Sequence, residues 1–315
     1  MSVLRIVVQK FGGSSLANAS IRNEALQRVW EAVELGLTPV VVVSAMGRGG
    51  DPYATDTLLS LLYEVNPEAD VVNTDLLLSC GEIISAAIFA VGLQKLGLPA
   101  VALTGWQSGI YTDDVHLGAR VQAVHAEKIW DVLKAGKIPV VAGFQGVTAQ
   151  GTITTLGRGG SDTTAAVLGV VLQAERVEIF TDVDGIKTAD PQLIPDAPTL
   201  RVLSYREVVE LAHMGAKVLH PRAAEITMEE GIPIQVLSVT QSSGGTMIGH
   251  GVKTKGGFGS EPVLDRVVTG IAHLGKRAQV KIAGLQDFHS SGLGPQIFQR
   301  LATAGVSVDL IFMSP

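Results

Sequence analysis

Cysteine is nearly absent from the sequence, with Cys80 the single example among 315 residues. One cysteine excludes an intramolecular disulfide framework and a cysteine-rich metal site. No group of His, Cys and Asp residues has zinc-ligand spacing, and no serine occupies a G-x-S-x-G turn. The seven histidines are scattered, so we interpret them as structural. We predict no metal site built from protein ligands alone.

Targeting and membrane-spanning segments are also missing. The amino-terminal segment MSVLRIVVQKFGG lacks the long apolar region and the cleavage site of a signal peptide. The longest apolar run, residues 83–93, is too short to span a bilayer and contains serine and glycine. We expect a cytoplasmic protein with no membrane partner.

Charge is scarce and mainly negative. Charged residues make up 17% of the chain and the formal net charge is −6. Because phosphate backbones select basic surfaces, this balance argues against nucleic acid as a partner. An acidic protein still binds small anions through backbone N–H groups and a few lysines. The 36 glycines and the 46% hydrophobic content favour an α/β protein with a sizeable core, in one or two domains.

Short β-branched runs alternate with segments of helical period. Strands are predicted at residues 4–8, 39–43, 99–103, 138–144, 176–180 and 233–237. Helices are predicted at residues 21–33, 75–96, 123–135, 163–173, 204–214 and 221–230. This alternation predicts an open, mainly parallel sheet sandwiched by helices.

The composition changes after Ile248. The stretch GHGVKTKGGFGSEP contains five glycines and no apolar periodicity, which is typical of a linker. Beyond it, strands are predicted at 267–272, 280–285 and 306–312, and a helix at 295–303. About 50 residues are marginal as an independent domain. We therefore predict a catalytic domain over 1–248, a linker over 249–266 and part of a small α+β domain over 267–315, completed by further chain or by a partner.

Two glycine-rich segments carry the first chemical signal. Lys10, Gly12 and Gly13 follow the first predicted strand, where glycines let backbone N–H groups approach a phosphate. The alternative is a glycine turn beside a surface lysine, since the segment is not a Walker A sequence. Residues 157–162, GRGGSD, lead into a predicted helix, whose N-terminus attracts anions. Two such loops in one α/β domain favour a phosphate-handling enzyme.

Charged residues near these loops admit both functional and structural interpretations. Arg158 has the geometry to clamp a carboxylate, whereas Asp162 is by itself more typical of a helix cap. Asp182 ends a predicted strand where a nucleotide would lie, or forms an ordinary turn. Glu82 is either a buried site residue or a solvated helix residue. Thr55 is either a hydroxyl contact or part of a helix N-terminus.

Seven motifs, taken in order, resemble those of the aspartate kinase family. They are KFGGSS (10–15), VVVSAMG (41–47), LLLSCGE (76–82), GFQG (143–146), TLGRGGSDTTA (155–165), FTDVDGI with TADP (180–191) and GAKVLHPRA (215–223). The resemblance runs from about residue 7 to residue 248. Within the wider amino-acid kinase group, the segments GRGGDPYATD and SCGE are most similar to monofunctional bacterial enzymes sensitive to diaminopimelate or lysine.

The resemblance implies an amino-acid kinase fold followed by a partial ACT-like domain. It also implies a phosphotransferase that moves the γ-phosphoryl group of ATP, with Mg²⁺, to the β-carboxylate of L-aspartate. The product is 4-phospho-L-aspartate, on the route to lysine and diaminopimelate, threonine and methionine. A homo-oligomer, such as a dimer, is expected. The alternatives are an acetylglutamate, glutamate or carbamate kinase and a non-catalytic amino-acid-sensing protein.

The resemblance also implies a division of the site. Residues expected to contact ATP are Lys10, Phe11, Gly12, Gly13, Ser44, Thr181, Asp182, Lys187, Asp190, Gln192 and Lys217. Residues expected to contact aspartate are Thr55, Glu82, Arg158, Gly159, Gly160, Ser161 and Asp162. In this scheme Glu82 holds the α-ammonium and Arg158 the α-carboxylate. The expected catalytic residues are Lys10, Gly13 and Asp162.

Two departures from the family pattern concern the nucleotide segment and the carboxyl-terminal region. Lys187 stands where the family usually has an aromatic or apolar residue, and Gln192 where it usually has arginine. The family carries two ACT-type domains, and the sequence reaches only part of the first. We expect the nucleotide contacts around Lys187 and Gln192 to differ in detail from those of the family.

Overall fold

The computed structural model describes residues 4–216, 218–241, 244–250, 268–273, 293–306 and 308. The chain divides into two compact units, Met1–His273 and Leu274–Pro315. In the second unit, the described element is helix α8 (Leu293–Thr303), which confirms the helix predicted at 295–303. The other elements in the described residues belong to the first unit.

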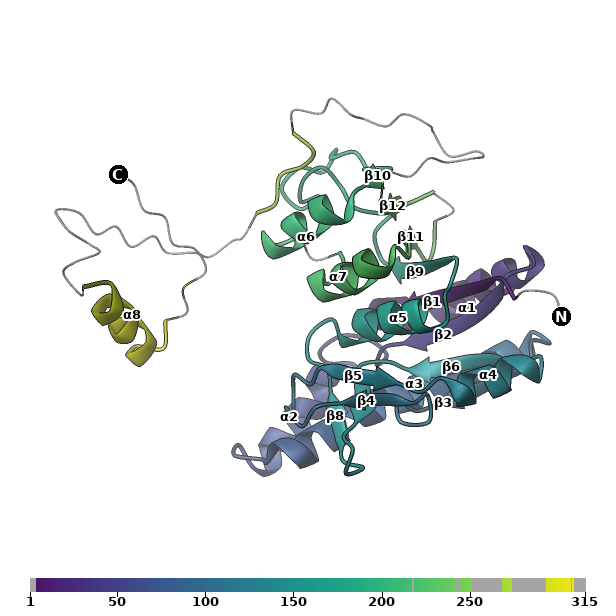
Figure 1. The fold of residues 1–315 in the computed structure, drawn as a ribbon, viewed down its shortest axis with the longest axis horizontal. Helices are drawn as coiled ribbons and strands as arrows, with labels where there is room; N and C mark the ends of the chain where they lie inside the picture. Colours follow the sequence, from purple (N-terminus) through teal and green to yellow (C-terminus); the bar gives the residue numbers. More distant parts are fainter. Residues whose placement is uncertain are drawn as a thin grey trace. The chain divides into compact units, whose positions relative to one another are not determined.

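An eight-stranded sheet forms the centre of the first unit (Figure 1). Its order is β10 (Val202–Leu203), β12 (Thr246–Ile248), β11 (Ile234–Ser238), β9 (Arg176–Thr181), β1 (Ile6–Phe11), β2 (Thr38–Val43), β6 (Ile138–Ala142) and β3 (Ala100–Leu103). All neighbouring pairs are parallel except β11 with β12. The predicted open, mainly parallel sheet is confirmed. The run TPVVVV of β2 is buried, as strands covered on both faces require.

Helices cover both faces of this sheet. On one face, α1 (Ala19–Glu34) and α3 (Val71–Lys95) contribute apolar side chains to a core with β2 and β6. The core of the other face draws on α4 (Glu127–Lys134), α5 (Gly160–Val171), α6 (Tyr205–His213) and α7 (Pro221–Glu230). Helix α2 (Thr55–Val65) packs on α3. The arrangement is a three-layer α/β/α sandwich.

A second sheet of four short strands was not predicted. Its order is β5 (Val121–Val124), β4 (Ile110–Thr112), β7 (Gln145–Val147) and β8 (Ile153–Thr155). The helix predicted at 123–135 is wrong over its first residues, because 121–124 form β5 and α4 begins at Glu127. Strands of three or four residues are too short to establish a period of two. β4 pairs with the nearby β5 and β7 with the nearby β8, and the pairing of Tyr111 with Val147 joins these two antiparallel pairs.

Helix α3 is longer than the apolar run within it. It spans 25 residues and, by length and composition alone, could cross a membrane. Half of its apolar window is nevertheless buried inside the fold, where it packs against β3, β6 and β8. We therefore interpret α3 as a core helix.

Predictions for the carboxyl-terminal region are only partly covered by the described residues. The strand predicted at 267–272 is wrong where it is described, because residues 268–273 form no strand. The N–H of Ile271 donates to the carbonyl of Thr188 over 2.8 Å. The strand predicted at 280–285 lies outside the described residues, and 306 and 308 form no strand. The division into a catalytic domain, linker and partial ACT-like domain remains a prediction.

Close contact between α5 and β9 predicts the effect of Gly169→Ala. Alanine would gain about 1 kcal/mol from helix propensity. However, a Cβ at Gly169 would lie 2.4 Å from Cγ2 of Val177, and such overpacking costs about 1–3 kcal/mol. We expect a net loss in the free energy of unfolding, measured by urea denaturation. The control Gly118→Ala has open space around its Cβ and should change stability little. A stabilised Gly169→Ala variant would contradict this packing.

Candidate active site

The carboxyl ends of β1, β2, β6 and β9 lie at one edge of the parallel sheet, so the loops that follow these strands meet there. The loop after β1 forms a short 3-10 helix, η1 (Gly13–Leu16). The N–H of Gly47, from the loop after β2, donates to the carbonyl of Gly13 over 3.0 Å. A Cβ at Gly13 would lie 2.6 Å from the carbonyl oxygen of Gly47 and 2.7 Å from that of Ala45. Only glycine allows this approach of the two loops.

Lys10 and Asp162 form the ion pair of this edge. Alternation along β1 puts Lys10 on the same face as Val8, the face that α5 covers. The Nζ of Lys10 lies 2.6 Å from Oδ1 of Asp162, with side chains only 13% and 11% exposed. A Cβ at Gly12 would lie 3.4 Å from this Nζ, an ordinary van der Waals contact, so the loop after β1 passes directly beside the ammonium.

Helix α5 begins earlier than predicted, and Asp162 is not its cap. The N-cap is Gly159, with a φ of 68°, and Gly160, Ser161 and Asp162 form the buried first turn. Glycine has no side chain to satisfy the free N–H groups of this end. The uncapped N-terminus therefore presents backbone donors and the positive end of the helix dipole next to Lys10.

Glu82 is buried with one unsatisfied oxygen. Its side chain is 2% exposed, and Oε1 accepts a hydrogen bond from the N–H of Ala45 over 2.9 Å. Oε2 has no partner among the described residues, and burial raises the pKa of Glu82 to about 8. At Gly81, a Cβ would lie 2.8 Å from that of Ala45. The close approach of α3 thus brings a carboxylate to the loop after β2, where it would accept a buried cation.

Arg158 is exposed between two glycines with positive φ, Gly157 at 73° and Gly159 at 68°. It makes no ion pair within the described part of the chain. The loop therefore presents a guanidinium that is unpaired in the described structure. The ring of His220 fills the space beside Gly159, where a Cβ would lie 2.2 Å from its Cγ.

The segment after β9 contacts the loop after β2 through Asp182, and an ion pair between Lys187 and Asp184 links residues within the segment itself. Asp182 is exposed, accepts a hydrogen bond from Thr181 Oγ1 over 3.1 Å and forms an ion pair with Arg48. The Nζ of Lys187 lies 3.0 Å from Oδ1 of Asp184. Hydrogen bonds from Lys187 and from a neighbouring threonine hydroxyl hold the pKa of Asp184 below its usual range.

The remaining nucleotide candidates are placed less directly. Asp190 Oδ1 accepts from the N–H of Gln192 over 2.9 Å, an Asx turn that a purely structural role also explains. Lys217 lies outside the described residues. The Phe11 ring is buried against those of Phe180 and Phe89, with centroids 4.8 and 5.2 Å apart. It therefore points into the core, away from the face of β1 that carries Lys10.

Two half-buried hydroxyl residues border the loop after β2. The N–H of Ser44 donates to the carbonyl of Phe11 over 3.0 Å, so β1 and the start of this loop are tied together. Thr55 is the first residue of α2. Roles for Ser44 and Thr55 in binding ligands stay predictions.

Two residues at this edge were missed from the sequence. Arg48 pairs with Asp182, and nothing in its local sequence signals this distant contact. The N–H of His220 donates to Oδ2 of Asp162 over 3.4 Å, and its Nδ1 is buried without a partner among the described residues. Burial lowers the pKa of His220. The sequence offers one signal for His220, its position close to the segment Gly215–Lys217, but the sequence analysis assigns all histidines a structural role.

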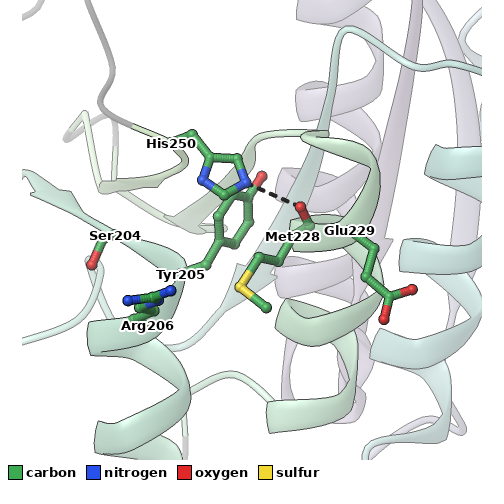
Figure 2. Close-up of a pocket in the computed structure, with 6 residues that line it drawn as sticks. All are labelled: Ser204, Tyr205, Arg206, Met228, Glu229 and His250. Atoms are coloured by element: carbon green, nitrogen blue, oxygen red, sulfur yellow. Dashed lines mark hydrogen bonds between the residues drawn. The ribbon is translucent and has the colours of Figure 1, made fainter.

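A cavity of about 450 Å³ lies elsewhere (Figure 2). It is lined by Ser204, Tyr205, Arg206, Met228, Glu229 and His250. The Tyr205 hydroxyl donates to the carbonyl of Ile232, just before β11 begins. The cavity therefore lies at the opposite edge of the sheet from the loops that carry Lys10 and Asp162. Of the predicted site residues that the structure describes, none lines this cavity.

Comparisons with known proteins agree with this geometry. The model of the amino acid kinase family matches residues 5–238. The chain is 45% identical to aspartokinase 1 of Bacillus subtilis (strain 168) over 99% of this chain and 76% of that protein. An aspartate kinase structure from Synechocystis has a TM-score of 0.68 and 39% identity, covering 79% of this chain and 40% of that chain. E. coli aspartokinase III in complex with aspartate and ADP has a TM-score of 0.74 and 28% identity, covering 98% and 76%.

The unsatisfied carboxylate of Glu82 predicts that Glu82→Gln stabilises the fold at neutral pH. The ordinary pKa is 4.5, and the folded value is about 8. Between these values the unfolded chain loses its proton while the folded chain keeps it, so stability falls as pH rises. Glutamine avoids this penalty, which amounts to about 3 kcal/mol at pH 7. Urea denaturation should show the variant more stable at pH 7–8 and the difference vanishing near pH 4.5.

Glu178→Gln is the matched control. Glu178 is buried too, but it accepts a hydrogen bond from Gln9 over 2.8 Å and pairs with Arg176 over 2.6 Å. Neutralising it removes an ion pair and should lower stability at pH 7. If Glu82→Gln also destabilised the fold at pH 7, Glu82 would have a partner that the structure lacks.

Proposed function

Because the chain belongs to the aspartokinase branch of the amino acid kinase family, we propose that it transfers the γ-phosphoryl group of ATP to the β-carboxylate of L-aspartate. E. coli aspartokinase III, of the same fold, has been solved with aspartate and ADP. The observation that carries the proposal for this chain is the Lys10–Asp162 pair at the uncapped N-terminus of α5. It joins a cation, backbone donors and a carboxylate at the edge where ligands of α/β sheets bind.

The phosphoryl group would lie between the loop after β1 and the start of α5. Lys10 supplies a positive charge there, and the N–H groups around Gly13 and at the α5 N-terminus supply oriented dipoles. Phosphoryl transfer needs mainly positioning and charge neutralisation. The β-carboxylate of aspartate is ionised at neutral pH, so no strong general base is required.

The acceptor would be held through its α-substituents. Glu82 Oε2 is a buried acceptor without a partner among the described residues, which suits an ammonium ion. Arg158 is exposed and unpaired there, which suits a carboxylate. An ammonium at Glu82 would lower its raised pKa, since an opposite charge favours the ionised form. The buried carboxylate thus becomes satisfied when substrate binds.

Mg²⁺ fits this site as a companion of ATP. Within the described residues, no three His, Cys, Asp or Glu side chains gather as metal ligands. Mg²⁺ is commonly held by one or two carboxylates together with substrate phosphates. Asp162 and Asp182 are the carboxylates beside the loop after β1 that would hold it. When bound, the ion would neutralise phosphate charge.

The proposal also covers the location, the oligomeric state and the domain organisation of the protein. We infer a cytoplasmic enzyme, acting as a homo-oligomer, with catalytic residues within 1–248 and a partial ACT-like regulatory segment after residue 266. A non-catalytic amino-acid sensor is disfavoured because Lys10, Asp162, Glu82 and Arg158 all border the same edge. Binding alone would not require the buried lysine opposite a helix N-terminus.

The decisive experiment is a coupled assay for ADP release with four acceptors. We expect release with aspartate and little with glutamate, acetylglutamate or carbamate. Release with another acceptor would assign the chain to a neighbouring kinase. Binding of aspartate and ATP without release would support the sensor.

Lys10→Ala should lower kcat more than it weakens ATP binding. Loss of one electrostatic donor to a transition state typically costs ~10²–10³-fold in rate. The variant also leaves Asp162 without its partner and should be less stable. Lys10→Ala/Asp162→Asn should regain stability, which would show that the stability lost in Lys10→Ala comes from the unpaired carboxylate of Asp162. A folded Lys10→Ala variant with near-normal kcat would remove Lys10 from the mechanism.

Glu82→Gln and Arg158→Ala should each raise the KM for aspartate and leave that for ATP nearly unchanged. Each loses a charge-assisted contact of about 1.5–3 kcal/mol. Arg158→Lys should recover only part, because lysine lacks the planar fork. Arg206→Ala, at the opposite edge, is the control and should change neither constant. If only the KM for ATP changed, Glu82 and Arg158 would belong to the nucleotide site and not to the aspartate site.

The KM for aspartate should also depend on pH. Because the pKa of Glu82 is about 8 in the free protein, the ionised form that accepts an ammonium grows as pH rises. The KM should therefore fall between pH 6 and 8, by up to about tenfold per unit. Glu82→Gln should flatten this profile. A flat profile in the unmodified chain would argue against Glu82 as the ammonium ligand.

A further inference from the structure

Asp75 is a second buried carboxylate on α3 and the phosphoryl-transfer scheme does not use it. It is completely buried. Its Oδ2 lies 2.6 Å from Nδ1 of His116, and its Oδ1 accepts from Thr155 Oγ1 over 2.5 Å. The N–H of Leu117 lies 3.2 Å from both oxygens. Both oxygens are therefore saturated by donors from two segments distant in the sequence.

These donors belong to segments that support the loop carrying Arg158 (residues 156–160), called the Arg158 loop below. His116 and Leu117 lie between β4 and β5, and Thr155 ends β8, three residues before Arg158. The N–H of Ala119 donates to the carbonyl of Thr155 over 2.9 Å. The next residues of the Arg158 loop are packed as closely. A Cβ at Gly157 would lie 3.0 Å from the carbonyl oxygen of Leu117.

Asp75 and Glu82 lie on the same face of α3. They are seven residues apart, which is about two turns or ~10 Å along the axis. Glu82 accepts from Ala45 at the loop after β2, whereas Asp75 holds the segments beneath Arg158. One rigid helix thus fixes the position of both proposed anchors of the acceptor.

We propose that Asp75, together with His116, is a positioning residue that holds the Arg158 loop in register with Glu82 for binding of the acceptor amino acid. The inference rests on the proposed function, because it takes Glu82 and Arg158 as ligands of the α-ammonium and α-carboxylate. Asp75 itself does not touch the substrate. Its loss acts through Leu117 and Gly157 on the backbone that carries Arg158.

A merely structural role predicts a different result, and a neighbouring pair provides the control. Thr112 Oγ1 and Thr154 Oγ1 form a buried hydrogen bond of 2.6 Å within the same four-stranded sheet. Thr112→Val breaks this bond on β4 without touching the contacts of Asp75. Thr112→Val and a variant that removes the contacts of Asp75 should both lower the melting temperature. Only the variant of Asp75 should displace the loop that carries Arg158.

The first test compares steady-state kinetics of Asp75→Asn, His116→Asn, the double variant and Thr112→Val in the full chain. Asp75→Asn and His116→Asn should raise the KM for aspartate about tenfold, with the KM for ATP within about twofold. The double variant should be little worse than Asp75→Asn, because both changes break one contact. Thr112→Val should leave both constants within about twofold. An unchanged KM for aspartate, or equal effects of Thr112→Val, would overturn the proposal.

The second test does not depend on the reaction. Amide hydrogen exchange over residues 156–160 should become faster in Asp75→Asn or, if that variant fails to fold, in His116→Asn, which keeps the contacts of Asp75 with Thr155 and Leu117. The same amides should be unchanged in Thr112→Val. Unchanged exchange in the Asp75 and His116 variants would overturn the positioning role, even if the unmodified chain phosphorylates aspartate. Faster exchange in a chain that releases no ADP with aspartate would instead reject the proposed function alone.

Discussion

The contact between Lys10 and Asp162 is the constraint on which the edge of the sheet depends. A largely buried ammonium and carboxylate each destabilise the fold if the other is absent, so β1 must bring Lys10 to the place where α5 presents Asp162. The pair therefore fixes the N-terminus of α5 above the carboxyl end of β1. Gly13 and Gly159 follow from the same constraint, because side chains there would clash with two carbonyl oxygens and with the His220 ring.

Helix α3 supplies the second constraint. Its two buried carboxyl groups, Asp75 and Glu82, differ in how far their oxygens are hydrogen-bonded. Asp75 receives hydrogen bonds on both oxygens and joins the helix to two distant segments. Glu82 has one oxygen without a partner among the described residues and a raised pKa. A buried group left unsatisfied costs stability in the free protein. Such a cost is typical of sites that keep a polar group ready for a ligand at the expense of the fold.

Much of the fold was predictable because its signals are local. β-branched runs such as that of β2, helical periods and glycine-rich loops mark strands, helices and the turns between them. In a parallel sheet the loops after the strands meet at one edge, so the grouping of Lys10, Asp162 and Asp182 followed from the order of elements. The four-stranded sheet, including β5 where a helix was expected, was not predictable. Its strands of three or four residues are too short to show a period of two, and the pairing of β4 with β7 joins segments that are separated by α4 and β6.

The sequence by itself determined the residue types, the order of the loops and the family to which they belong. Only the tertiary structure decided the partner and state of each charged group. Asp162 looked like a helix cap and proved to be the partner of Lys10. Glu82 was ambiguous and proved buried, while Asp75, which has no motif around it that signals a contact, proved to join three segments. Burial and pairing depend on residues 37 to 152 positions away along the chain, and only packing brings these together.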